Sequence, residues 1–319
     1  MIGLLKKKMH ANTLAAVCPD GAGVAVAQIR RDNDAPPMLE LCQYQDFESG
    51  KDDKVALEKL VKDKKLDHSL CVSLVELDDY SLVMVEAPEV QPEEMVAAVR
   101  WRIKDLIDFN VDDAVIDVFE VPDTKAGSNK TMMYAVVARI AQVKHRIEKL
   151  LGAGLNLDII DIPELALRNI AAMLPEDVAG VAMVYIGKDK GLITITRQDT
   201  LYLSRRINTG VSALPDTLMQ NNDPTVIEGW LGGVIIEIQR SLDYYESHFA
   251  LPPISSLVVA PMPDHVPGVA EYISSQLDIS TRMLDVKTLV DTEEELDYQK
   301  QSQCLLAIGA ALRSEELAA

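Results

Sequence analysis

The stretch from Leu157 to Gly210 shows the clearest alternation of apolar runs and polar breaks in the chain. Its first apolar run predicts a strand over Leu157–Ile162, and Pro163 suits the first turn of a following helix. Three more apolar runs, separated by two short polar turns, predict further strands. These strands cover Val181–Ile186, Gly191–Thr196 and Leu201–Ile207. This part of the chain is therefore expected to form a strand, a crossover helix and an antiparallel meander.

Two parts of the chain repeat one order of elements, namely three strands, a helix and a strand. In the N-terminal part these are Thr13–Cys18, Val24–Arg30, Leu39–Tyr44, a helix over Asp53–Lys62 and Leu70–Leu74. In the C-terminal part the meander is followed by a helix from Asp223 to about Phe249, a strand at Ile254–Ala260 and a helix over His265–Leu277. Asp223 can cap the long helix, with Pro224 in its first turn. The repeated order predicts a duplicated, two-lobed α/β fold.

A different unit interrupts the first lobe. A strand at Tyr80–Glu86, a helix over Pro92–Ile107, a hairpin over residues 115–137 and a helix over Gln142–Leu151 indicate an inserted α+β subdomain. Near the end of the chain, Thr292 and Glu295 fit a capping box, and Cys304–Leu312 predicts a helix rich in small residues. The predicted domains are a flexible N-terminus (1–11), lobe 1 (12–79), the subdomain (80–154), a crossover helix (155–178), lobe 2 (179–290) and a C-terminal helix packing back on lobe 1 (291–319).

Composition and charge disfavour several classes of partner and site. The chain has 319 residues and a net charge of −19, which disfavours nucleic acid and anionic lipid as partners. The basic run Lys6-Lys7-Lys8 is compatible with contact to a membrane, but a solvated terminus is the favoured interpretation. No window approaches the roughly 20 apolar residues that span a bilayer, and no signal peptide is evident, so we expect a cytosolic protein. Its four cysteines are expected to be reduced and mostly buried, and its five histidines lack metal-ligand spacing.

Several stretches together resemble one known family. They read VRWRIKDLIDFNVDDAVIDVFEVP, DIPELALRNIA, LYLSRRI, IQRSLDYYESH and AIGAALR. From about residue 10 to residue 314 the chain resembles the MshI proteins of the mannose-sensitive haemagglutinin (MSHA) type IV pilus, which are relatives of PilM. The resemblance implies the two-lobed, actin-like ATPase (PilM/FtsA-like) α/β fold with an inserted α+β subdomain in the first lobe. It also implies a cytoplasmic protein that docks at the inner membrane on the N-terminal tail of a PilN-like (MshJ-type) protein, within the pilus assembly machinery.

The family's relatives bind ATP, but the motifs for this are altered here. Actin-type proteins place an Asp-x-Gly turn in each phosphate-binding hairpin, where the acid holds hydrated magnesium and the glycines expose backbone N–H groups. Here the register puts Cys18 at the acidic position of the first hairpin, Tyr185 replaces the acid of the second, and Ala260-Pro261 replaces two glycines near the adenosine. The degenerate candidate site consists of Asp20, Gly21, Gly23, Gly187 and Gly191. Plain turn geometry is the favoured interpretation of the glycines, so we expect no required cofactor, no hydrolysis and at most weak binding of ATP and magnesium.

The resemblance places the partner's tail in a groove between the first lobe and the subdomain. In the helix over residues 92–107, Met95, Val99, Ile103 and Leu106 share one face and Trp101 lies nearly opposite. An outward tryptophan is expected to meet something, and packing against the lobe competes evenly with contact to the peptide. The candidate groove residues are Trp101, Arg100, Arg102 and Lys104, although a solvated face explains the three cations as well. Trp230, within its helix's apolar stripe, is expected to be core.

Three functions follow from these features. The leading one is a non-catalytic scaffold for pilus assembly, because assembly interfaces survive without metal-binding acids. The second is an ATP-binding switch, an ATPase or a sugar kinase of the same fold, which should show an intact Asp-x-Gly turn and a catalytic carboxylate. The third is a filament-forming protein like FtsA, and a homodimer also stays open.

Overall fold

The computed structural model describes residues 12–32, 35–47, 53–121, 131–214 and 224–314. By its contacts the chain divides into two units. Unit 1 combines residues 1–79, 140–166 and 286–319, and unit 2 combines residues 80–139 and 167–285. Each unit is thus built from segments that lie far apart in the sequence. The predicted Lys6–Lys8 contact and the Asp223 cap fall outside the described residues.

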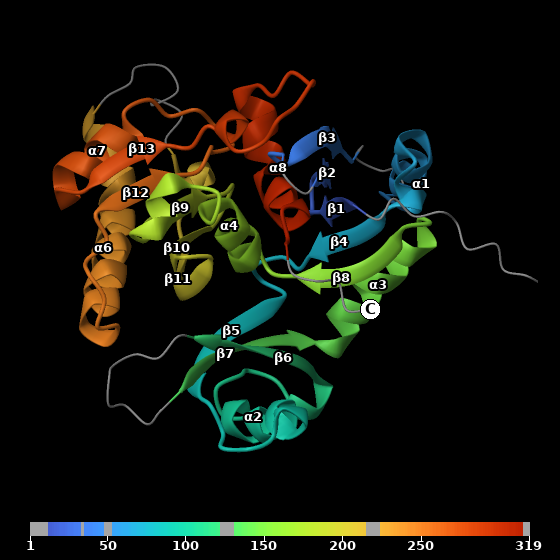
Figure 1. The fold of residues 1–319 in the computed structure, drawn as a ribbon, viewed down its shortest axis with the longest axis horizontal. Helices are drawn as coiled ribbons and strands as arrows, with labels where there is room; N and C mark the ends of the chain where they lie inside the picture. Colours follow the sequence, from blue (N-terminus) through green and yellow to red (C-terminus); the bar gives the residue numbers. More distant parts are fainter. Residues whose placement is uncertain (1–11, 33–34, 48–52, 122–130, 215–223, 315–319) are drawn as a thin grey trace, which may run out of the picture. The chain divides into compact units, whose positions relative to one another are not determined.

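Unit 1 contains a five-stranded sheet in the order β3-β2-β1-β4-β8 (Figure 1). Its strands are β1 (Thr13–Pro19), β2 (Gly23–Arg30), β3 (Met38–Asp46), β4 (Leu70–Leu74) and β8 (Asn156–Asp161). β1 to β3 are antiparallel, whereas β1, β4 and β8 run parallel. Antiparallel neighbours can be joined by a tight turn, but parallel neighbours need a crossover. Helix α1 (Asp53–Lys64) lies in the crossover between β3 and β4.

Helices cover both faces of this sheet. α1 and α3 (Ile140–Gly152) pack Leu57 and Leu150 into a hydrophobic cluster with Ala15 and Val17 of β1. α8 (Tyr298–Ala311) packs against β1 to β4 from the other side (Figure 1). Successive strand residues point to opposite faces, so the near-continuous apolar sequence of β1 serves both layers.

Unit 2 contains a second five-stranded sheet in the order β11-β10-β9-β12-β13. Its strands are β9 (Val181–Ile186), β10 (Gly191–Arg197), β11 (Thr200–Ile207), β12 (Ser256–Val259) and β13 (Ser280–Met283). As in unit 1, three antiparallel strands are followed by two parallel ones. The predicted repeat of elements is therefore confirmed by the strand order of the two sheets.

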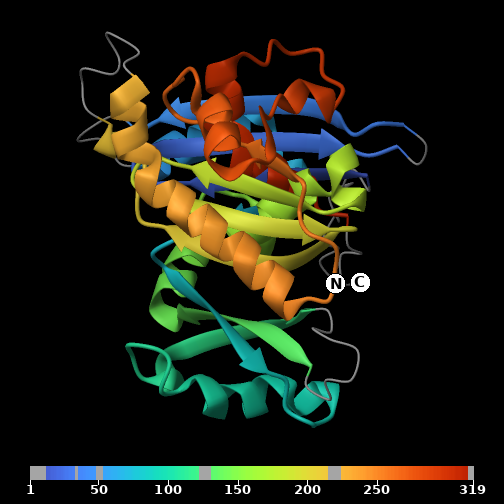
Figure 2. The ribbon, with the colours of Figure 1, turned by 90° about the vertical axis from the view of Figure 1, so that its left-hand side faces the viewer.

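Two further helices lie in unit 2, and a third, α4, spans the boundary between the two units. They are α4 (Pro163–Ala171), which follows β8, α6 (Pro224–His248) and α7 (Val269–Leu277). Figure 2 shows α6 lying across β10 and β11. Trp230, Leu231 and Val234 of α6 are buried in the core beneath it. The prediction that Trp230 belongs to the core is confirmed, because only 7% of it is exposed.

Residues 80–139 form a three-stranded antiparallel sheet in the order β5-β7-β6, with one helix. These elements are β5 (Tyr80–Glu86), α2 (Met95–Ile103), β6 (Ala114–Val121) and β7 (Met132–Arg139). One face of the sheet packs on Val99 and Ile103 of α2. The other face joins the core of unit 2 through Tyr134, whose hydroxyl accepts a hydrogen bond from the backbone N–H of Ser204 at 3.2 Å.

The chain of this subdomain is inserted between β4 and β8 of unit 1, but its contacts group it with unit 2. The predicted subdomain extends to residue 154 and so includes α3, whereas the contacts group α3 with unit 1. The reason is that Leu150 packs among unit 1 strands. The predicted lobe boundaries themselves stay a prediction.

Two local expectations are wrong. Leu106 is not part of a buried face, because α2 ends at Ile103 and Leu106 is 57% exposed. Thr292 does not cap a helix. Its hydroxyl donates to the carbonyl of Leu39 at 3.0 Å and accepts from Glu294, which ties this segment to β3. α8 is capped instead by Asp297, whose carboxylate accepts from the backbone N–H of Lys300 at 2.8 Å.

Glycine inside α6 leads to a stability prediction. A Cβ added at Gly233 would meet no atom within 4 Å. Glycine in a helix interior costs about 1 kcal/mol relative to alanine. We expect Gly233→Ala to raise the free energy of unfolding by roughly 0.5–1 kcal/mol in urea titrations. A loss of stability would contradict the open space seen at this position.

An ion pair in unit 2 predicts a pH-dependent contribution. Arg282 Nε donates to Glu176 Oε1 at 2.6 Å, and this hydrogen bond lowers the pKa of Glu176. A carboxylate whose pKa is lowered on folding stabilises the fold above its unfolded pKa of about 4.3, and this stabilisation is lost as the pH falls through the folded value. Because Arg282 is 42% exposed and water screens the pair, we expect Arg282→Met to cost at most about 1 kcal/mol at pH 7, and less at a pH below the lowered pKa of Glu176. Thermal unfolding at both pH values measures this difference, and an equal loss at both would exclude the ion pair as its cause.

Candidate functional site

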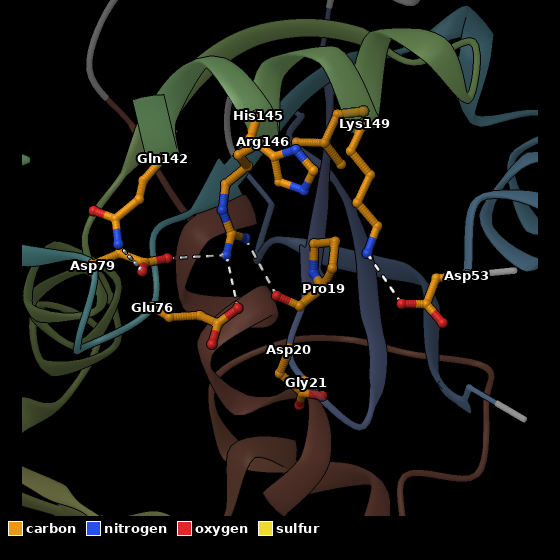
Figure 3. A pocket seen from close by; sticks show the side chains of 11 residues that line it. Pro19, Asp20, Gly21, Asp53, Glu76, Asp79, Gln142, His145, Arg146 and Lys149 are labelled. Carbon is orange, nitrogen blue, oxygen red and sulfur yellow. Dashed lines mark hydrogen bonds and ion pairs between the residues drawn. The ribbon is translucent and has the colours of Figure 1, made fainter. Parts of the chain in front are cut away.

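A pocket of about 270 Å³ lies in unit 1, between the β1–β2 turn and α3 (Figure 3). Its lining combines backbone of the turn, four carboxylates and one face of α3. The lining residues are Pro19, Asp20, Gly21, Asp53, Glu76, Asp79, Gln142, His145, Arg146, Lys149 and Leu150. Two of the predicted site residues, Asp20 and Gly21, therefore line a pocket.

Helix α3 supplies one wall of the pocket, because its polar residues are spaced so that they lie on one side of the helix. Gln142, His145, Arg146 and Lys149 follow one another at intervals of three, one and three residues, which places them on one side of a helix. Leu150 is fully buried at the edge of this stripe and anchors the helix to the core. The polar stripe consequently faces the turn in Figure 3.

Arg146 joins α3 to the ends of two strands. Its guanidinium donates to the carbonyl oxygens of Leu74 at 2.7 Å and Pro19 at 3.2 Å, and to Glu76 Oε1 at 2.9 Å. The side chain is only 11% exposed, so its charge is largely removed from water and depends on these acceptors. Gln142 adds a bond from Nε2 to Asp79 Oδ1 at 3.0 Å. The wall of the pocket is thus held by bonds within unit 1.

The pocket carries more negative than positive charge. Its four carboxylates face two cations, and Lys149 Nζ lies 3.5 Å from Asp53 Oδ2 in an exposed pair that contributes little to stability. Next to the pocket, burial raises the pKa of the Cys18 thiol to about 12, which keeps it protonated and a poor nucleophile at neutral pH. Among the described residues, no group of His, Cys, Asp and Glu side chains is arranged to hold a metal ion.

The first hairpin turn is closed by its own carboxylate. Asp20 Oδ1 accepts hydrogen bonds from the backbone N–H groups of Ala22 at 2.8 Å and Gly23 at 2.7 Å. The Tyr44 hydroxyl donates to the same oxygen at 3.2 Å. Burial, followed by the charge of Asp20, raises the pKa of Tyr44, so this hydroxyl stays a donor. A Cβ at Gly23 would lie 2.5 Å from the carbonyl oxygen of Gln45, and the close approach of two strands therefore requires glycine there.

The second hairpin turn, in unit 2, is closed by a neighbouring segment. The N–H of Gly187 donates to Lys190 O at 2.8 Å, and the N–H groups of Val211 and Ser212 donate to Gly187 O and Lys188 O. Ser212 Oγ donates to Asp189 Oδ1 at 2.8 Å. Gly191 stands where a Cβ would come within 2.3 Å of Tyr185 O. Gly187 and Gly191 thus have a structural role in the turn.

The predicted groove residues lie on or next to α2, in unit 2, and none of them lines the pocket. Arg100 donates to the carbonyl oxygens of Val111 and Ala114, and Arg102 donates to that of Glu86 at 2.8 Å. Lys104 is exposed at the C-terminal end of the helix. Trp101 is 73% exposed. Both alternatives for this side chain, packing against the parent lobe and contact with a peptide, stay predictions.

Sequence reasoning missed the α3 wall of the pocket. The polar stripe Gln142, His145, Arg146 and Lys149 was available as a signal, because polar residues at helical spacing mark a face that does not enter the core. It also missed Tyr44, which approaches Asp20 only through the register of β2 with β3.

Comparison with known proteins identifies the family. Residues 56–229 match the model of the family described as type IV pilus assembly protein PilM. No curated protein matches the chain. A solved structure described as the PilM–PilN type IV pilus biogenesis complex superposes with a TM-score of 0.74 at 17% identity, covering 94% of this chain and 97% of that one.

Two further structures are similar at lower scores. One is a Bacteroides thetaiotaomicron protein with an actin-like ATPase fold and unknown function, with a TM-score of 0.49, 8% identity and coverage of 94% and 98% of the two chains. The other is the cytoplasmic domain of EpsL, an inner-membrane component of the type II secretion system of Vibrio cholerae. It has a TM-score of 0.47, 12% identity and coverage of 96% and 97%.

The predicted PilM-like, actin-type α/β fold is confirmed by the match to the PilM–PilN structure and by the two sheets of matching order. In the described ranges, no helix is both long and apolar enough to cross a membrane. The family model covers more than half of the chain, and the chain therefore belongs to the PilM family of type IV pilus assembly proteins.

Proposed function

We propose that this protein is a non-catalytic scaffold for assembly of an MSHA-type pilus, with the role of an MshI protein. In this proposal it lies in the cytoplasm, at the inner membrane, and docks on the N-terminal cytoplasmic tail of a PilN-like (MshJ-type) protein. Support comes from its PilM family and from its similarity to a structure that contains PilM and PilN together.

One observation carries the non-catalytic part, namely the carboxylate of Asp20 inside the first hairpin turn. Phosphates bind such turns through free backbone N–H groups. Here the N–H groups of Ala22 and Gly23 are already bonded to Asp20 Oδ1, and its negative charge would repel a phosphate. The residues present therefore do not fit a nucleotide phosphate at this turn.

The second turn supports the same conclusion. Its carboxylate, Asp189, is bonded to Ser212, and Tyr185 stands where actin-type proteins have the magnesium-binding acid. A hydrolase of this kind depends on magnesium to neutralise charge on the transferred phosphoryl group. A scaffold needs no such acid, so its surface can persist while these motifs change.

Calorimetric titration of the full chain tests the proposal. We expect no heat with ATP and magnesium, and measurable binding of a synthetic peptide with the N-terminal tail sequence of a PilN-like protein. Micromolar binding of ATP would overturn the non-catalytic claim and favour a nucleotide-controlled switch. Failure of the peptide to bind would overturn the docking claim. Light scattering at increasing protein concentration separates the scaffold from a filament-forming protein and reports a homodimer.

A further inference from the structure

One side of helix α6, which lies in front of the sheet of unit 2 in Figure 2, combines bare backbone with an exposed apolar side chain. Gly229 and Gly233 are exposed there and Gly232 is half-buried. A Cβ added at any of these glycines would meet no atom within 4 Å outside the helix backbone. Ile236, one turn further along, is 52% exposed, whereas Ile238 is fully buried. An isoleucine thus stands in water beside a stretch of helix that has no side chains.

Packing inside the chain does not require these glycines. Glycine in a helix interior is destabilising relative to alanine, and it is needed only where a side chain would clash. No such clash exists at the three positions, while Trp230 and Val234 hold the opposite side of α6 in the core. Bare backbone at a surface lets a second helix approach closely, because the distance between packed helices depends on the side chains at their contact. This side of α6 therefore suits a helix that approaches from outside.

Charges at the two ends of this stretch make it complementary to itself. Glu228, Gly232, Ile236 and Arg240 follow at four-residue steps, so they form one row along the helix. Glu228 and Arg240, at the ends of the row, are both exposed. If α6 of a second copy lies antiparallel, with Ile236 of each copy against Gly232 of the other, then Glu228 of each copy faces Arg240 of the other. Apolar fit and charge pairing are satisfied together.

Other registers lose this match. If Ile236 faced Gly229 instead, Glu228 would face Glu237 of the second copy, and the two carboxylates would repel each other. With the register shifted by one residue in the other direction, Glu228 would face Ser241, which is fully buried within unit 2. The fit of the isoleucine and the pairing of the charges therefore select the same register independently.

Arg240 can join such a contact without giving up its present one. Its Nη1 donates to Glu237 Oε1 at 2.7 Å, and Glu237 is itself held by Arg205 of β11 at 3.2 Å. A guanidinium has five N–H donors, and the Arg240 side chain is 63% exposed. Donors therefore remain for a carboxylate from outside. An arginine that is already held on one side also loses less conformational entropy on binding.

We propose that this side of α6 binds α6 of a second copy of the chain in antiparallel orientation, with Ile236 against Gly232 and Glu228 paired with Arg240 across the contact. Each pairing occurs twice, and this two-fold symmetry closes the assembly at a dimer. The 25 residues of α6 make a helix about 37 Å long. A contact between two such helices is smaller than the roughly 1,600 Å² of a standard interface, so we expect a weak dimer. The inference does not depend on the proposed function.

Sedimentation equilibrium on the full chain tests the dimer at about 1 µM to about 1 mM protein, which spans moderate to weak affinities. Salt at about 0.15 M screens the net charge of −19 on each copy. The average mass should rise to that of two copies and no further. Gly232→Gln, which covers the bare backbone, and Ile236→Ala should each weaken dimerisation about tenfold or more. Val178→Ala, at another exposed apolar residue of unit 2, is the matched control and should leave it unchanged.

Exchanging the two charges tests the register. Glu228→Arg and Arg240→Glu should each weaken dimerisation, because every pair across the antiparallel contact then joins like charges. The double variant restores opposite charges in this register and should regain the lost affinity. In a parallel contact each residue would face its own counterpart, so the single substitutions would not change the pairing of charges. Thermal unfolding of each variant verifies that it is folded.

Three results would overturn the inference. The first is the mass of one copy at every concentration, and the second is a mass that rises beyond two copies. The third is a dimer whose affinity neither Gly232→Gln nor Ile236→Ala changes, which would place the contact elsewhere. A double charge variant that stays as weak as the single variants would overturn the register. None of these results bears on docking to the tail of a membrane protein, which the peptide titration measures separately.

Discussion

Arg146→Met is expected to lower the free energy of unfolding by about 3 kcal/mol. The substitution leaves the carbonyl oxygens of Leu74 and Pro19 without their donor in a largely buried site, and it also leaves Glu76 without its partner. Breaking a buried charge network by removing one member typically costs 3–5 kcal/mol, and the half-exposed Glu76 places this case at the low end. Chemical denaturation monitored by circular dichroism measures the effect.

The matched control is Arg240→Met on α6. Arg240 also pairs with a carboxylate, Glu237 Oε1 at 2.7 Å, but it is 63% exposed. Exposed pairs contribute at most about 1 kcal/mol. Equal losses for Arg146→Met and Arg240→Met would contradict the role of Arg146 as the link between α3 and the strand ends.

Gly210→Ala is expected to cost roughly 2–3 kcal/mol, the range for forcing an extra methyl into a packed site. A Cβ at Gly210 would lie 2.2 Å from the carbonyl oxygen of Lys188 and 2.5 Å from the backbone nitrogen of Asp189. Because both are backbone atoms, the clash cannot be relieved by rotating a side chain. The second hairpin turn must then separate from the segment that closes it.

Two readouts make this prediction specific. Trp230 Nε1 donates to Gly210 O at 3.1 Å, so a displaced backbone should change the emission of the buried tryptophan. Gly233→Ala serves as the control, since it introduces the same methyl group where no atom lies within 4 Å. Unchanged stability in Gly210→Ala would mean that the close approach of the two segments is not required.

The strands and hairpins could be predicted from the sequence because local chemistry determines them. Pro19 to Gly23 and Gly187 to Lys190 carry turn residues between apolar runs, and both turns form where expected. The strand β13 could not be predicted from local sequence. Its four residues, Ser280–Met283, are mostly polar and become a strand only by pairing with β12 at the sheet edge.

The site was less predictable because it depends on contacts between distant segments. Cys18 pairs with Ala25 in the first hairpin, a register that is set by the turn between the two strands. That Asp20 bonds the N–H groups of its own turn depends on a side-chain rotamer, which no spacing specifies. The hydrogen bond from Arg102 to the carbonyl oxygen of Glu86 likewise joins residues 16 positions apart. A sequence pattern therefore shows the cation but not its acceptor.

The carboxylate inside the first hairpin turn also affects how this protein would respond to the energy state of a cell. A protein stabilised by a bound nucleotide gains stability in proportion to the logarithm of ligand concentration and loses it when the ligand is depleted. At this turn the stabilising anion is covalently part of the chain, so its local concentration never changes. The turn should keep its shape in starved and in growing cells alike. The melting temperature of the protein should not depend on added nucleotide.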